Sequence, residues 1–104
     1  MNTFGITQKS YQLILAALKD YQEIEKAVLF GSRAKGNYKK GSDIDLAITG
    51  KNVSAKVALN LKAYLNEVLP IPYYLDVVAY DLLNQPDLKE HIDRIGISFY
   101  QKQS

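Results

Sequence analysis

The sequence predicts an α/β or α+β domain in which helices pack on one face of a small mixed β-sheet. Three observations predict this class. Segments with helical periodicity and segments with strand-like alternation follow one another along the chain. The composition, with 47% hydrophobic and 23% charged residues, is typical of a globular protein. No repeat, low-complexity tract or linker interrupts the 104 residues, so residues 1–104 are expected to form a single domain.

The first half of the chain begins with a predicted helix over residues 7–25. Thr7 is a suitable N-cap, because its hydroxyl can accept a hydrogen bond from a first-turn N–H. The apolar positions of this segment that recur at helical spacing are Tyr11, Ile14, Leu15, Leu18 and Tyr21. Residues 26–30 form a short apolar run that ends at Gly31, which predicts a buried strand. Residues 33–42 are basic and glycine-rich, which predicts a loop with room for one helical turn.

Residues 43–49 alternate between apolar and other side chains, which predicts a strand with two different faces. Ile44, Leu46 and Ile48 would point to one face, while Asp43 and Asp45 would point to the other. The face without helices would therefore carry the carboxylates.

The second half repeats the helix and strand pattern. Residues 54–69 have an apolar stripe at helical spacing and end before Pro70, which predicts a second helix. Residues 73–80 are rich in β-branched and aromatic residues, which predicts a third strand. A last helix is expected to start near Asp87, where Asp87 and Glu90 would form a capping box, and to stop at Gly96.

Composition excludes several classes of function. The chain has no cysteine, so disulfides, thiolate metal sites and a cysteine nucleophile are ruled out. This fits a reducing compartment, and we expect a cytoplasmic location without a membrane span or signal peptide. The formal net charge of +2 is too small to indicate nucleic-acid binding.

Two aspartates at strand spacing supply the first chemical signal. Asp43 and Asp45 would aim their carboxylates into one space, because residues two apart on a strand face the same way about 6.5 Å apart. Like charges this close repel unless a cation lies between them, and hard carboxylate oxygens suit Mg²⁺. The plain structural alternative is a solvated strand end, with Ser42 and Asp43 as turn residues.

Asp76 is a third acidic candidate, since it interrupts an otherwise apolar strand. A carboxylate in such a run needs a partner, because burying an unpaired charge is costly. A bound metal ion would supply that partner, and so would a salt bridge with a nearby lysine or arginine.

Gly31 and Ser32 follow the first strand, and ten residues separate Ser32 from Asp43. A glycine lets backbone N–H groups approach a phosphate closely, and the serine hydroxyl adds a donor. Arg33 and Lys35 would help to neutralise a triphosphate, since arginine can grip phosphate oxygens at two points. A simple strand-ending turn followed by a solvated basic loop is the alternative.

Other phosphate and metal motifs do not fit. Gly31 and Gly36 have the glycine spacing of a P-loop, but Asn37 and Tyr38 stand where lysine and serine or threonine are needed. The glycines do not form a dinucleotide fingerprint, and the Asp-x-Asp pair runs into apolar residues rather than into a calcium loop. His91 is the only histidine and is expected on the last helix, as a surface or partner-facing residue.

Together these residues resemble the signature of the polymerase-β-like nucleotidyltransferase superfamily. Gly31-Ser32 is followed after ten residues by Asp43-Ile44-Asp45, and Asp76 takes the place of the third carboxylate. The short chain is similar to the minimal nucleotidyltransferase (MNT) subgroup, whose members pair with HEPN-domain proteins in toxin–antitoxin modules. The resemblance spans about residues 10–96.

The resemblance implies the polymerase-β-like fold and a reaction that uses two Mg²⁺ ions. Asp43 and Asp45 would ligate both ions, while Asp76 would ligate one and help to deprotonate the acceptor hydroxyl. The residues expected to hold the nucleotide phosphates are Gly31, Ser32 and Arg33. ATP is the implied donor, although another nucleoside triphosphate stays open. The implied acceptor of AMP is a tyrosine of a HEPN toxin, which would make this chain an antitoxin.

Two further functions stay open at this stage. A binding-only antitoxin would neutralise its HEPN partner by occlusion, with the eight tyrosines suited to the interface. A stand-alone transferase would modify a small molecule such as an antibiotic. The complete set of three aspartates favours catalysis, because binding does not require it. The acceptor, the base of the nucleotide and a homo- or hetero-oligomeric state are not determined by the sequence.

Overall fold

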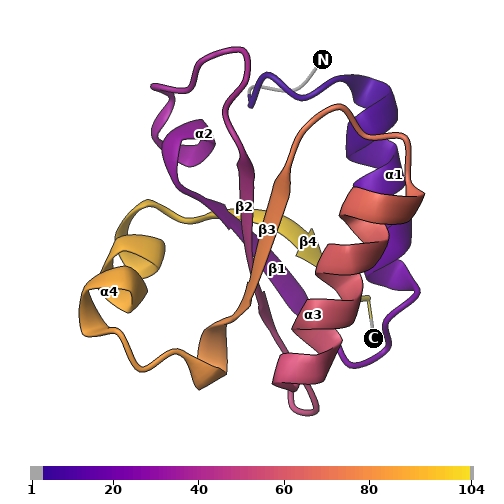
Figure 1. Ribbon diagram of the computed structural model, residues 1–104. Helices are drawn as coiled ribbons and strands as arrows, with labels where there is room; N and C mark the ends of the chain where they lie inside the picture. Colours follow the sequence, from indigo (N-terminus) through magenta and orange to yellow (C-terminus); the bar gives the residue numbers. More distant parts are fainter. Residues whose placement is uncertain (1–3, 104) are drawn as a thin grey trace.

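The computed structural model describes residues 4–103, which form a four-stranded β-sheet with helices on both faces (Figure 1). The strands are β1 (Lys26–Phe30), β2 (Ile44–Thr49), β3 (Leu75–Ala79) and β4 (Ile97–Gln101), in the order β3-β2-β1-β4. β1 runs antiparallel to both β2 and β4, whereas β2 and β3 are parallel. This mixed sheet confirms the predicted fold class.

The main hydrophobic core lies between the sheet and two helices, α1 (Gln8–Lys19) and α3 (Ala55–Ala63). The predicted alternation of β2 is confirmed, because Ile44, Leu46 and Ile48 are all buried in this core. None of the helices in residues 4–103 is long and apolar enough to cross a membrane.

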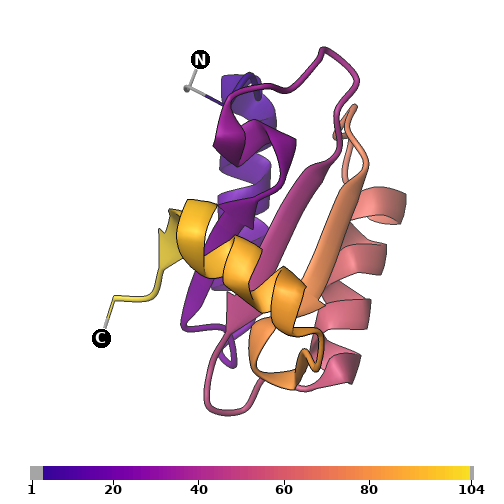
Figure 2. The same cartoon turned by 90° about the vertical axis from the view of Figure 1, so that its left-hand side faces the viewer.

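The helix α4 (Pro86–Ile95) lies on the opposite face of the sheet (Figure 2). Ile92 of α4 packs against Phe30 and Ala47 in a second, smaller apolar cluster. The expectation of helices on one face therefore holds for α1 and α3, and α4 is the exception. The 3-10 turn η2 (Tyr80–Leu82) directly after β3 begins the connection that carries the chain across to this face.

Two helix boundaries differ from the sequence prediction. Thr7 caps α1 as predicted, accepting a hydrogen bond from the Ser10 N–H at 3.3 Å, but the helix stops at Lys19 instead of residue 25. The predicted capping box of α4 is wrong. Pro86 occupies the first turn, its fixed φ suits the start of a helix, and Gln85 becomes the N-cap without a side-chain bond.

Strand β4 has no counterpart among the predicted elements. It follows Gly96 at once and contributes Phe99 to the main core, where the Phe99 ring lies 5.0 Å from that of Tyr11. The segment is only five residues long and its pairing with β1 contains a register shift, so its alternation is weak. The signal in the sequence that could have predicted this strand is the pair of β-forming residues Phe99 and Tyr100 shortly after the predicted helix stop.

The helix α3 continues into a π-helical turn, η1 (Tyr64–Val68), which positions Asn66 at the open edge of β3. The Asn66 side chain accepts the Leu75 N–H at 2.9 Å, and its amide donates to the Leu75 carbonyl at 2.8 Å. The same amide donates to the Lys62 carbonyl at 3.0 Å. Because the Tyr74 carbonyl accepts from Ile44 of β2, the Leu75 groups face the outer edge, where Asn66 takes the place of a neighbouring strand.

Replacing Asn66 with alanine is expected to lower the free energy of unfolding by about 1–3 kcal/mol, since it leaves half-buried backbone groups without partners. Urea unfolding followed by circular dichroism measures the change. The matched control is Asn60→Ala, an exposed position on α3, which should stay within about 0.5 kcal/mol of the parent protein. Equal unfolding midpoints for the two variants would contradict this role of Asn66.

Candidate active site

The carboxylates of Asp45 and Asp76 are brought together by the parallel pairing of β2 and β3. Asp45 is the direct partner of Asp76 in this register, so the two side chains leave the same face of the sheet. The backbones of paired strands lie about 4.8 Å apart. On its other side, Asp45 pairs with Phe30, the last residue of β1. The predicted convergence of these two aspartates is thus present in the fold.

The third aspartate, Asp43, is exposed and lies just before β2, on the same side as Asp45. The pKa of Asp45 is raised above its ordinary value, first by partial burial and then by the negative charges of Asp76 and Asp43, while His91 opposes the increase. Asp45 therefore lies where negative charge accumulates without full compensation, which is a place that favours a bound cation.

Gly31 directly abuts Asp45, which explains the need for glycine at this position. Its φ of 77° and ψ of −158° belong to a region that is essentially restricted to glycine. A Cβ atom built on Gly31 would also collide with the Asp45 carboxylate. The Gly31 turn and the acidic pair thus form one packed unit, although ten residues separate Ser32 from Asp43.

Ser32 begins α2 (Ser32–Lys35), a single helical turn for which Gly31 is the N-cap. The turn is closed by hydrogen bonds from the Lys35 N–H to the Gly31 carbonyl at 3.1 Å and from the Gly36 N–H to the Ser32 carbonyl at 3.0 Å. Backbone N–H groups at the start of a helix lack acceptors within the helix. Ser32 is half-buried and directly follows the glycine that touches Asp45, so this turn begins next to that carboxylate.

Arg33, expected from the sequence to bind phosphate, is 2% exposed and holds the following loop instead. Its Nη1 donates to the Phe4 carbonyl at 2.7 Å, and its Nε and Nη2 donate to the Ser42 carbonyl at 3.2 and 2.8 Å. The guanidinium carbon lies 5.1 Å from the ring centre of Tyr38 and 4.9 Å from that of Tyr73. These contacts make Arg33 a positioning residue for the loop that ends at Asp43, and they give no support to a phosphate contact.

The variant Arg33→Lys is expected to lower the free energy of unfolding by roughly 1–3 kcal/mol, because lysine keeps the charge but cannot reproduce the planar fork of donors. Thermal unfolding provides the measurement, with the exposed Lys35→Met as a control that should leave stability nearly unchanged. A variant of parental stability whose KM for the nucleotide rises would instead assign Arg33 to the phosphates.

Asp76 forms an ion pair with Lys62 of α3, between Oδ1 and Nζ at 3.1 Å. The ammonium also lies 5.6 Å from the centre of the Tyr74 ring, and hydrogen bonds to Tyr74 and then to Asp76 raise the pKa of Lys62. The salt bridge that the sequence left open for Asp76 therefore exists, alongside the approach of Asp76 to Asp45. The two side chains are 34% and 41% exposed, so the pair is weak.

His91, which the sequence analysis predicted to be a surface or partner-facing residue of the last helix, lies near the carboxylates. It lies on α4 as expected, but it is half-buried, and its ring meets the Phe30 ring edge-on at 6.2 Å between centroids. Its charge acts on Asp45 across the interface between α4 and the sheet. No local pattern in the sequence links positions 45 and 91, so only the packing of α4 makes the connection.

The oxygen ligands of the site suit Mg²⁺, although the carboxylates do not form a tight cluster. Among the residues that the structure describes, no three acidic or histidine side chains lie close enough to form a ligand group. Asp76 is paired with Lys62 instead. The available ligands are hard carboxylate oxygens. Burial raises the pKa of Asp45 first, and the negative charges of Asp76 and Asp43, which a divalent cation would offset, raise it further.

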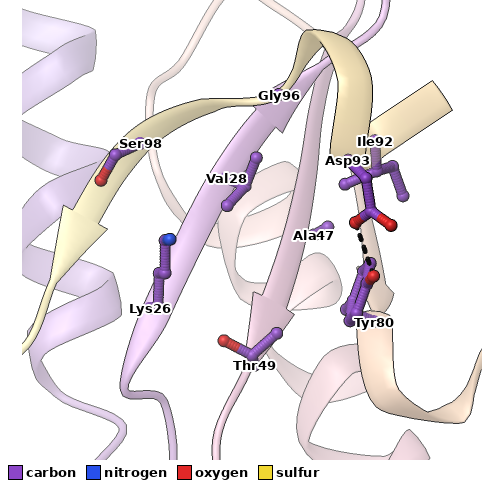
Figure 3. Close-up of a pocket in the computed structure, with 9 residues that line it drawn as sticks. All are labelled: Lys26, Val28, Ala47, Thr49, Tyr80, Ile92, Asp93, Gly96 and Ser98. Atoms are coloured by element: carbon purple, nitrogen blue, oxygen red, sulfur yellow. Dashed lines mark hydrogen bonds between the residues drawn. The ribbon is translucent and has the colours of Figure 1, made fainter. Parts of the chain in front are cut away.

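A separate hollow of about 340 Å³ lies between α4 and the sheet (Figure 3). Its lining includes Lys26 and Thr49 at the far end of β1 and β2 from Phe30 and Asp45. Tyr80 donates a hydrogen bond of 2.6 Å to Asp93 at its wall. None of the candidate catalytic or nucleotide-binding residues lines this hollow, so it is separate from the candidate site.

The sequence matches the family model described as "Polymerase beta, Nucleotidyltransferase" over residues 12–104. This match includes every candidate residue of the site. No curated protein matches the chain.

Several solved structures share the fold. One is described as a toxin–antitoxin with AMP-PNP, at 22% identity, a TM-score of 0.72, and coverage of 89% of this chain and 74% of that chain. A second, from Shewanella oneidensis, contains a tri-AMPylated HEPN toxin in complex with an MNT antitoxin, at 20% identity, a TM-score of 0.68, and coverage of 91% and 72%. A third is a putative nucleotidyltransferase from Sulfolobus solfataricus, at 17% identity, a TM-score of 0.54, and coverage of 98% and 91%.

Proposed function

The chain belongs to the polymerase beta nucleotidyltransferase family, and on this premise we propose that it is a Mg²⁺-dependent nucleotidyltransferase that transfers AMP from ATP to a hydroxyl group of a partner protein. The observation that supports the proposal is the direct pairing of Asp45 with Asp76 on neighbouring strands, with Asp45 in contact with the Gly31 turn and Asp43 two residues before it. Residues 1–104 act in it as one catalytic domain.

In this proposal each candidate residue has a defined role. Asp43 and Asp45 would hold two cations, and Asp76 would hold one of them. Mg²⁺ bound there would supply charge neutralisation for the phosphates and the attacking oxygen. Gly31 and Ser32 present backbone and hydroxyl donors to the phosphates, and Arg33 supports them by fixing the loop before Asp43.

The reaction is an in-line displacement at the α-phosphorus. The acceptor oxygen forms the new bond to phosphorus while the bond between the α-phosphorus and the bridging oxygen breaks, so that pyrophosphate leaves with its electron pair. The proton of the acceptor hydroxyl passes to the Asp76 carboxylate. Such a transfer depends mainly on alignment and charge neutralisation, which rigid strands provide.

The partner in this proposal is a HEPN-domain protein, and the acceptor is one of its tyrosines. The support comes from the solved structures of the same fold, which include a toxin–antitoxin with AMP-PNP and an AMPylated HEPN toxin bound to an MNT antitoxin. By this analogy the chain acts as the antitoxin of a cytoplasmic module. Its sequence identity to these two proteins is 22% and 20%.

A binding-only antitoxin is the second candidate, because the surface exposes several large apolar side chains. Leu59 is 66% exposed, Val68 65%, Leu82 56% and Tyr74 51%. Such residues suit a protein interface whether or not the carboxylates act on the partner.

The test is incubation of the protein with labelled ATP, GTP, CTP or UTP and Mg²⁺, alone and with the product of the adjacent gene. We expect label from ATP on the neighbouring protein, and no label when the cation is chelated. Neutralisation of the neighbour without any label would favour binding alone. Absence of both label and binding would reject the proposal.

A further inference from the structure

The positive charge of Lys62 lies next to the two paired carboxylates of the candidate site. Its ammonium lies 3.1 Å from the Asp76 carboxylate, and Asp76 is the direct strand partner of Asp45. The ion pairs among residues 4–103 are this one and Arg94–Glu90, so Asp45 forms no ion pair in that part of the chain, although the charge of His91 acts on it from α4. One of the two neighbouring carboxylates is thus neutralised by the protein itself, and the other is not.

We propose that Lys62 is a built-in counter-ion, which occupies the Asp76 carboxylate in the metal-free protein and must give it up when a divalent cation binds. Lys62 thereby sets the affinity of the site for the cation. The inference rests on the proposed function in so far as Asp76 is a cation ligand there.

The chemistry of lysine suits such an exchange. An ammonium on a flexible stem is a point charge without the two-pronged geometry by which arginine locks a carboxylate. The pair is partly exposed, so the ammonium can return to water at little cost. Tyr74, two residues before Asp76 and directly before β3, offers a second contact, since its ring centre lies 5.6 Å from the Lys62 ammonium. Lys62 can therefore leave Asp76 and keep a partner.

The competition has a predictable direction. A cation that approaches Asp76 must break the ion pair and is also repelled by the nearby ammonium. Removing the ammonium while keeping the aliphatic stem, in Lys62→Met, is therefore expected to strengthen binding of the metal ion, roughly three- to tenfold. Lys62→Arg should bind the ion no more tightly than the parent protein.

The experiment measures the Kd of Mn²⁺ alone, without nucleotide or partner, by calorimetry and by electron paramagnetic resonance of the free ion. The matched control is Lys56→Met, which removes the same charge from an exposed position six residues earlier on α3 and should change the Kd less than about twofold. In Asp76→Asn protein, the further change Lys62→Met should alter the Kd less than it does in the parent protein, because only the through-space repulsion is left to remove. Circular dichroism confirms that each variant is folded.

An unchanged or weaker Mn²⁺ affinity in Lys62→Met, or an equal gain in Lys56→Met, would overturn the inference, and so would a parent protein that binds no Mn²⁺. The outcome is separable from that of the proposed function. A gain in Mn²⁺ affinity without any nucleotide transfer by the parent protein would leave Lys62 as a counter-ion and reject the enzyme. Nucleotide transfer by the parent protein, together with an unchanged Mn²⁺ affinity in Lys62→Met, would keep the proposed function and reject the counter-ion role of Lys62.

Discussion

Replacing Gly31 with alanine is expected to damage both the fold and the reaction. An alanine at position 31 must adopt a backbone conformation that costs residues other than glycine about 1–3 kcal/mol. Its Cβ would also push against the Asp45 carboxylate. A displacement of about 1 Å at a catalytic group can cost a hundredfold in rate, so transfer should fall by at least roughly that factor. Chemical denaturation and a labelled-nucleotide assay measure the two effects.

Gly36 provides the matched control, because it too has a positive φ, 87°, but an added Cβ would meet nothing within 4 Å. Gly36→Ala should therefore cost about 1–2 kcal/mol through its left-handed conformation and leave transfer by the folded protein intact. Equal loss of transfer in the two variants would show that general destabilisation, and not contact with Asp45, makes Gly31 necessary.

Replacing Asp45 with asparagine is expected to abolish transfer while making the protein more stable at neutral pH. The loss should exceed about 10²–10³-fold, the range found when one preorganised electrostatic group is removed from an active site. Burial, together with the charges of Asp76 and Asp43, raises the pKa of Asp45, so its ionised form is disfavoured in the folded protein. The asparagine side chain has no such charge, so the melting temperature of the variant without metal should be higher than that of the parent protein.

The pH dependence of stability follows from the same shift. The folded protein binds the Asp45 proton more tightly than the unfolded chain does, so the cost of ionisation is fully present above the folded pKa. It is absent below the unfolded value near 3.8. The stability difference between Asp45→Asn and the parent should therefore shrink as the pH falls through the acidic range, as thermal melts would show.

The exposed Asp81→Asn is the control for these measurements and should change neither transfer nor stability appreciably. Normal Mg²⁺-dependent transfer by Asp45→Asn would reject the assignment of Asp45 to the reaction. A lower melting temperature would contradict the electrostatic account of its pKa.

Local periodicity predicted most of the fold, because it reflects which side of an element is buried. The alternation around Asp45 correctly separated the core face of β2 from the acidic face, and the stripe in residues 54–69 identified the second helix. The helix end at Lys19, the first turn of α4 and strand β4 escaped this reasoning. Each of these is decided by a turn, a proline or a partner strand, and such features add little to a periodic pattern.

For the candidate site, the sequence determined the chemical groups. The Gly-Ser pair and the three aspartates have a spacing that identifies a family. Only the tertiary structure decided how those groups are used. The pairing of β2 with β3 placed Asp76 beside Asp45, the loop enclosed Arg33 away from solvent, and α3 brought Lys62 to Asp76. The physical reason is that residue type and spacing are local properties, whereas the partner of a charge depends on which distant segment packs against it.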